Sequence, residues 1–183
     1  RETLALIEEL TQQAWQTPFS TRVDSISNFQ YTEAEEDDLI VRNLVEDAES
    51  LSDAELDAVK NVALHEPLLA KRLISPAGHV TAVNITINLP GVNEIEETPQ
   101  VVNFVRALAD DIRAEQPDIE VYLSGVIMMN QAFSEATKSD MKTLIPLSFA
   151  LMLLILALMV GGISGTLVTL LVIAFSIVSA MGL

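Results

Sequence analysis

The sequence predicts an α+β protein in which a ferredoxin-like (split βαβ) domain is followed by a transmembrane helical hairpin. Two observations predict this fold class: the distribution of charged residues along the chain and the spacing of its apolar residues. All of the 26 acidic and 10 basic residues lie at or before Lys142, and the apolar stretch from Thr143 to Leu183 contains none. Before that boundary, apolar residues recur with helical spacing in some stretches and with strand spacing in others. The chain therefore divides into a charged domain and an uncharged apolar segment.

The charged domain is about the size of one globular domain and is long enough to bury a core. It carries the whole formal net charge of −16. Such a charge repels nucleic acid and anionic lipid headgroups, so we expect no nucleic-acid partner. The sequence has no cysteine, which excludes disulfides and thiol chemistry.

The first predicted helix carries an apolar stripe that begins at Leu4 and ends before Pro18. Strand-like spacing follows over residues 21–31. The side on which the apolar residues fall changes between Ile26 and Phe29, and we expect a β-bulge there.

An acidic run follows this strand and is predicted to be a solvated turn. The run contains Glu33, Glu35, Glu36, Asp37 and Asp38. A divalent-cation site is the alternative, but the glycine and the alternate ligand spacing of a calcium loop are missing.

Ser52 and Glu55 have the spacing of a capping box, which predicts a helix that begins there and continues through Val59. Pro67 interrupts this pattern. We expect a shorter helical piece after it, ending at about Leu73.

The clearest strand signal is at residues 83–89, where apolar odd-numbered positions alternate with polar even-numbered ones. Thr98 and Pro99 then predict the N-cap and first residue of a helix that ends before Pro117. Alternation over residues 119–123 predicts a last short strand.

These elements follow the order helix, strand, helical insert, strand, helix, strand. One further strand before residue 1 would complete two βαβ halves, which is the split-βαβ arrangement over residues 1–125. We therefore expect strands 83–89 and 119–123 to share one sheet. Val83, Ile85 and Ile87 should face the helix at 98–116.

The apolar segment is predicted to be a membrane hairpin. A helical connector at 126–143 runs without a break into a transmembrane helix at 144–160, a glycine-rich turn follows at 161–165, and a second transmembrane helix occupies 166–183. A single helix over the whole apolar run would be about 60 Å long, twice the hydrocarbon thickness. Because the chain begins without Met and ends within an apolar run, we expect it to be an internal piece of a longer membrane protein.

No catalytic, cofactor-binding or metal-binding constellation is evident. His65 and His79 have no metal-ligand spacing and are predicted to be surface residues, and no glycine-rich phosphate loop occurs. We expect no enzymatic activity, cofactor or metal. The polar side chains of the predicted spans are hydroxyls such as Ser148, Thr169, Ser176 and Ser179, which do not titrate, so these spans should act as scaffold.

Three stretches carry a resemblance to a known family: Phe19–Asn28, Leu73–Ile87 and Asp140–Leu147. Together they resemble the resistance-nodulation-division (RND) superfamily, specifically its hydrophobe/amphiphile efflux branch of MMPL-like and sterol-sensing-domain-like exporters. The resemblance covers the first porter loop and the second and third membrane helices of that family. Its relatives usually place arginine near the turn at 161–165, where this chain has glycines.

The resemblance implies a multi-pass protein of the cytoplasmic (inner) membrane whose residues 1–142 are extracytoplasmic, with the porter-like domain over residues 1–125. It implies export of hydrophobic or amphiphilic molecules or lipids, driven by the proton-motive force. The implied partners are membrane lipid, the substrate and a possible homo-oligomer. The first porter strand would precede Arg1, and the proton-relay residues would lie on later helices.

Two other function classes remain open from the sequence. A sterol- or lipid-sensing membrane receptor shares the same membrane architecture. A protein-export accessory membrane subunit also joins a porter-like domain to a helix bundle. An ionisable residue within the next membrane helices would favour transport.

Overall fold

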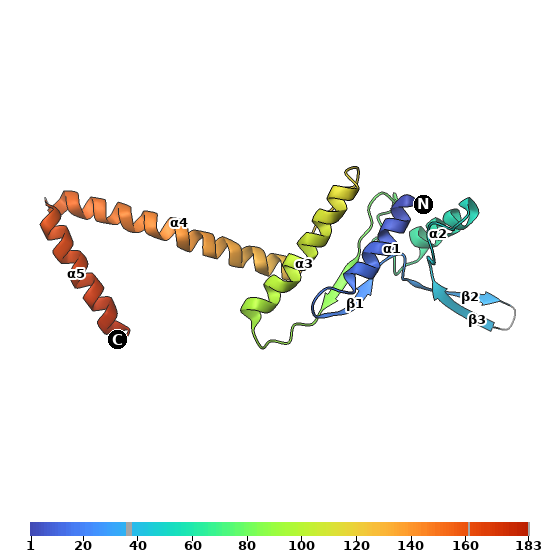
Figure 1. Cartoon of the computed structure of the whole chain (residues 1–183), viewed down its shortest axis with the longest axis horizontal. Helices are drawn as coiled ribbons and strands as arrows, with labels where there is room; N and C mark the ends of the chain where they lie inside the picture. Colours follow the sequence, from blue (N-terminus) through green and yellow to red (C-terminus); the bar gives the residue numbers. More distant parts are fainter. Residues whose placement is uncertain (36–37, 161, 183) are drawn as a thin grey trace. The chain divides into compact units, whose positions relative to one another are not determined.

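The structure is a computed structural model that describes residues 1–35, 38–160 and 162–182. By its internal contacts the chain divides into two compact units, Arg1–Met128 and Met129–Leu183 (Figure 1). The architecture is α+β, as the sequence predicts.

Helix α1 spans Glu2–Ala14 and ends before Pro18, which confirms the first predicted helix. Its buried face carries Ile7, which belongs to the core cluster with Ile26 and Leu69. The same face carries Thr11, whose Oγ1 donates to the carbonyl of Ile7 at 2.6 Å and lies 2.8 Å from Ser25 Oγ.

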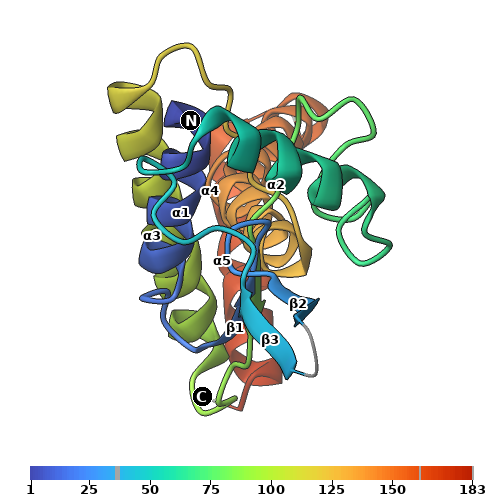
Figure 2. The ribbon, with the colours of Figure 1, turned by 90° about the vertical axis from the view of Figure 1, so that its right-hand side faces the viewer.

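The strands form two separate two-stranded sheets. Strand β1 (Ser20–Asp24) pairs antiparallel with β4 (Asn84–Ile87), and β2 (Gln30–Glu35) pairs antiparallel with β3 (Asp38–Asn43). Figures 1 and 2 show the β2–β3 hairpin projecting from the rest of the first unit.

The expectation of one bulged strand over residues 21–31 is wrong. The apolar residues change sides at the point where the chain leaves one sheet and enters the other. The irregularity in strand register lies elsewhere, between Ser20 and Arg22. The linking residues Ser25 and Ser27 are buried, and their hydroxyl groups bond to each other and to Thr11. These side-chain hydrogen bonds hold the segment between β1 and β2 against α1, so this segment pairs with neither sheet.

Strand β3 was not predicted, although Leu39, Ile40 and Val41 are residues with high strand propensity. Part of the acidic run expected to be a turn belongs to the hairpin strands: Glu33 and Glu35 lie in β2 and Asp38 lies in β3. Residues 36–37 lie outside the described residues.

Helix α2 spans Asp53–His65, and its capping box is confirmed. The backbone N–H of Ser52 donates to Glu55 Oε2 at 2.7 Å. The helical piece expected up to Leu73 does not form, because turns and the isolated bridges Ala70–Ile74 and Ile74–Thr81 occupy this region. Lys71 has a φ of 63°, which no right-handed helix accommodates.

In and around β4, Val83, Ile85 and Ile87 are half-buried and the even-numbered residues are exposed, which confirms the predicted alternation of buried and exposed side chains. Residues 119–123 show the same alternation of half-buried and exposed side chains but belong to no strand. The sheet expected between the two segments is therefore absent. An extended segment forms a strand only when the backbone N–H and C=O groups of a neighbouring segment pair with its own.

Helix α3 spans Glu94–Glu115, so the predicted start at Thr98 and Pro99 is wrong and both residues lie inside the helix. Pro99 removes one helical hydrogen bond. Glu97 offsets this loss, because its carboxylate accepts the N–H groups of the loop that leads into the helix.

Helix α4 spans Val126–Val160, and its 35 residues run without a break through Lys138, Lys142 and Pro146, as predicted. Helix α5 spans Ile163–Ala180. The expected turn at 161–165 is shorter than predicted, because Ile163–Gly165 belong to α5. Gly161 lies outside the described residues.

Candidate functional site

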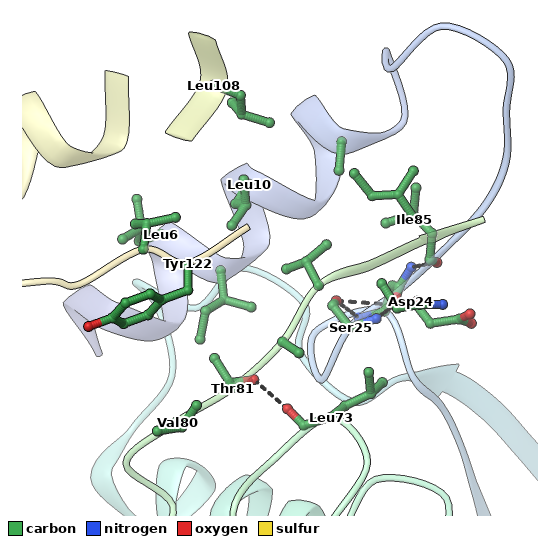
Figure 3. Close-up of a pocket in the computed structure, with 18 of the residues that line it drawn as sticks. Leu6, Leu10, Asp24, Ser25, Leu73, Val80, Thr81, Ile85, Leu108 and Tyr122 are labelled. Carbon is green, nitrogen blue, oxygen red and sulfur yellow. Dashed lines mark hydrogen bonds between the residues drawn. The ribbon is translucent and has the colours of Figure 1, made fainter. Parts of the chain in front are cut away.

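The first unit contains a cavity of about 1420 Å³ (Figure 3). Figure 3 shows Leu6 and Leu10 of α1, Leu108 of α3 and Ile85 of β4 around it. Residues 119–125 complete the lining. The lining is mainly apolar because each of these amphipathic elements presents its apolar side to the cavity.

Only four charged residues line the cavity, and their formal charges cancel: Arg22, Asp24, Arg72 and Glu120. Arg22 Nε lies 2.7 Å from Asp24 Oδ1 in an ion pair. The lining is therefore formally neutral although the chain carries −16.

Tyr122 lies at the cavity with 82% of its surface exposed. Its hydroxyl donates to Glu120 Oε2 at 2.7 Å. This hydrogen bond, together with the charge of Glu120, raises the pKa of Tyr122. The Tyr122 phenol is thus a hydrogen-bond donor to the Glu120 carboxylate.

The residues that the sequence assigned to the surface are found there. His65 and His79 are exposed; His65 Nδ1 lies 2.8 Å from the carbonyl of Asn61, and His79 Nδ1 lies 3.4 Å from Ser75 Oγ. Among the described residues, no group of three or more His, Cys, Asp or Glu side chains is arranged to hold a metal ion.

The carboxylate of Glu97 is a buried polar feature that the sequence did not reveal. It accepts backbone N–H groups from Gly91 at 3.0 Å and from Val92 and Asn93 at 2.9 Å each. The hydrogen bond from Asn93 is the largest cause of a lowered pKa, with those from Gly91 and Val92 adding to it against the opposing effect of desolvation. This site closes the loop before α3 and is structural.

Within the part of the chain that the structure describes, α4 alone is long and apolar enough to cross a membrane, over Val126–Met159. The apolar part of α5, Ser164–Ala180, is shorter. At 1.5 Å per residue, the 18 residues of α5 span about 27 Å, close to the hydrocarbon thickness of about 30 Å.

The hydroxyl groups of the apolar segment fall into two kinds. Thr166 Oγ1 donates to the carbonyl of Gly162 at 3.1 Å and Thr169 Oγ1 to that of Gly165 at 3.0 Å, so both are satisfied within their own helix. Ser148, Ser176 and Ser179 are exposed on the helix surfaces. No residue from Thr143 to Leu183 has an ionisable side chain.

An acidic α+β unit and an apolar segment share one continuous helix, α4, and this arrangement indicates a membrane protein. A comparison with protein families identifies the class to which the chain belongs. The model of the MMPL family matches residues 5–183, and the chain belongs to this family of RND-type membrane transporters. No curated protein and no solved structure matches the chain.

Proposed function

We propose that the chain is part of an exporter that uses the proton-motive force to move hydrophobic or amphiphilic molecules or lipids out of the cytoplasmic membrane. Membership of the MMPL family supports transport. The observation that carries the finer proposal is α4, because one unbroken helix leads from the acidic unit into the apolar segment. Such a helix is suited to couple movements outside the membrane to movements within it.

The energy for this coupling must enter through other parts of the full-length transporter. A proton-driven protein needs an ionisable group within the membrane whose charge changes during the cycle. The segment from Thr143 to Leu183 has none, so α4 and α5 act as scaffold.

In this proposal residues 1–142 lie outside the cytoplasm, residues 1–125 form the porter domain, and α5 forms the second span of a membrane hairpin. Ferredoxin-like topology for the porter domain belongs to the same proposal.

The test uses the full-length transporter in lipid vesicles that contain a fluorescent amphiphile. An imposed pH gradient should accelerate loss of the amphiphile from the membrane, and a protonophore should abolish the acceleration. Binding of the amphiphile without gradient-driven movement would instead indicate a lipid-sensing receptor. Vesicles with an unrelated membrane protein of similar size serve as the control.

A further inference from the structure

Helix α4 carries a stripe of two basic and two large apolar side chains. Its members follow one another at spacings of four, three and four residues: Lys138, Lys142, Ile145 and Phe149. At 3.6 residues per turn, this spacing places all four within about 60° of one another around the helix axis. All four are exposed, Ile145 at 46% and Phe149 at 51%. The stripe is therefore an accessible surface that is cationic at one end and apolar at the other.

The change from cationic to apolar coincides with the start of the uncharged segment. Residues 143–160 of α4 contain no charged side chain, and at 1.5 Å per residue they span about 27 Å. This length is close to the hydrocarbon thickness of about 30 Å. When α4 crosses a membrane, Lys142 therefore lies at the edge of the hydrocarbon, and Lys138 lies about 6 Å further out at the depth of the headgroups. Ile145 and Phe149 lie at the depth of the adjoining acyl chains.

The two ammonium groups are available to a ligand. Within the part of the chain that the structure describes, neither Lys138 nor Lys142 forms an ion pair. Asp140 lies between them in the sequence, but its position is about 160° around the helix from each lysine, so it belongs to the other side of α4. Glu135 Oε1 accepts a hydrogen bond from Gln131 Nε2 at 2.9 Å.

The acidic character of the chain does not extend to this stripe. Residues 126–142 contain two acidic and two basic side chains, which cancel, so the whole net charge of −16 belongs to residues 1–125. Lys138 and Lys142 are also the only basic residues after Arg113. The last basic groups of the chain therefore stand together on one side of α4, directly above an apolar surface.

We propose that the stripe binds one anionic phospholipid in the membrane leaflet that borders the charged domain. The lipid phosphate lies between the ammonium groups of Lys138 and Lys142, which donate charge-assisted hydrogen bonds to its oxygens. An acyl chain of the same lipid packs over Ile145 and Phe149. The long lysine stems follow the helix surface and keep their charged ends among the headgroups. A zwitterionic headgroup binds less well, because it brings a cation of its own towards the lysines.

Two other occupants satisfy the observations less well. A neighbouring membrane helix with an apolar surface would cover Ile145 and Phe149 but would leave the two lysines without an anion beside it, which is costly. Inorganic phosphate would neutralise the lysines but would leave the apolar half of the stripe uncovered. A phospholipid matches both halves, because its anionic group and its acyl chain are joined in the order that the stripe requires.

Photo-crosslinking of the full-length transporter tests the proposal. The protein is placed in nanodiscs that contain phosphatidylglycerol and phosphatidylcholine in equal amounts. A diazirine residue replaces Phe149, and in a matched control it replaces Leu147, which is 66% exposed and lies about 160° around the helix. Mass spectrometry of the adducts gives the ratio of the two lipids at each position. We expect phosphatidylglycerol to be enriched at residue 149 by about tenfold over residue 147.

Charge variants identify the groups that select the lipid. Lys138→Gln combined with Lys142→Gln should abolish the enrichment at residue 149, whereas Lys138→Arg combined with Lys142→Arg should retain it. Lys60→Gln combined with Lys71→Gln removes the same charge from exposed positions of the first unit and should leave the enrichment unchanged.

Four outcomes would overturn the proposal. Two concern the adducts at residue 149: equal labelling of the two lipids, or labelling of peptide in place of lipid. The third is an enrichment that persists in the double glutamine variant. The fourth is an enrichment that vanishes when inorganic phosphate replaces chloride at constant ionic strength, which would identify free phosphate as the ligand. The site rests on α4 as a membrane span, so each of these outcomes leaves the proposed export untouched.

Discussion

The backbone N–H of Asn93 donates to Glu97 Oε1 at 2.9 Å, so a side chain within α3 caps the residue that precedes the helix. The same carboxylate also binds the N–H groups of Gly91 and Val92. These three bonds fix the loop between β4 and α3. They also stabilise the ionised form of Glu97 in the folded protein.

Replacing Glu97 with Gln should lower the melting temperature of the transporter at neutral pH. Because folding lowers the pKa of Glu97, its contribution is present above the unfolded pKa of about 4.3 and is lost as the pH falls through the folded value. The difference between wild type and Glu97→Gln, measured by thermal unfolding over a pH series, should therefore shrink in acid. Glu96→Gln, an exposed neighbour, is the control. An equal loss at every pH would contradict this account.

The capping box of α2 gives a second test. Ser52→Ala removes the hydroxyl that accepts the N–H of Glu55, and removal of such a cap costs about 1 kcal/mol. Denaturant unfolding of the same protein measures the loss. Ser52→Thr retains the hydroxyl and should stay near wild type. If both variants lose the same stability, the hydroxyl bond is not the cause.

Continuity of α4 is tested by Ser139→Pro, because Ser139 lies between Lys138 and Lys142 in an unbroken helix. Proline there removes a helical hydrogen bond and costs about 3 kcal/mol, which favours a kink. Gradient-driven transport should fall strongly while membrane insertion is retained. Ser139→Ala is the matched control and should transport normally. Normal transport by the proline variant would show that a rigid connection is unnecessary.

Proton coupling should not depend on the hydroxyl groups of the apolar segment. Alanine at Ser148, Thr169, Ser176 and Ser179 removes groups that do not titrate, so transport and its dependence on the pH gradient should be largely retained. The vesicle assay described above measures both. Loss of coupling in one single variant, with expression and melting temperature preserved, would overturn the scaffold role.

Salt should stabilise the protein. The sequence has 26 Asp and Glu residues but 10 Lys and Arg residues. If each Lys or Arg pairs with one carboxylate, 26 − 10 = 16 carboxylates have no basic residue to neutralise them. Raising potassium chloride from about 0.01 M to about 1 M shortens the Debye length from about 30 Å to about 3 Å and weakens this repulsion. The melting temperature should rise over that range. A constant or falling value would mean that repulsion does not limit stability.

Features set by local chemistry could be predicted from the sequence. The capping box needs only Ser52 and Glu55 at the right spacing, and the alternation around Ile85 needs only one buried face. The continuity of α4 follows from the lack of helix breakers between Val126 and Ile145. The MMPL family was predicted as well, from short stretches spread over the chain.

Features that depend on distant partners could not be predicted. The chain leaves the first sheet at Ser25 because its hydroxyl bonds to Thr11 on another element, and periodicity does not record such a bond. The start of α3 depends on a Glu97 side chain that reaches back to the loop. Residues 119–123 have the pattern of a strand but no partner among the described strands, and pairing is not encoded in one segment alone.

The β2–β3 hairpin has a practical consequence for handling the protein. Leu39 and Val41 of β3 are 73% and 57% exposed, and among the described residues no further strand pairs with the outer edge of β2 or β3. Apolar side chains beside an open edge are a template for strand-to-strand aggregation. Concentrated preparations of the protein should therefore be prone to precipitate through β3.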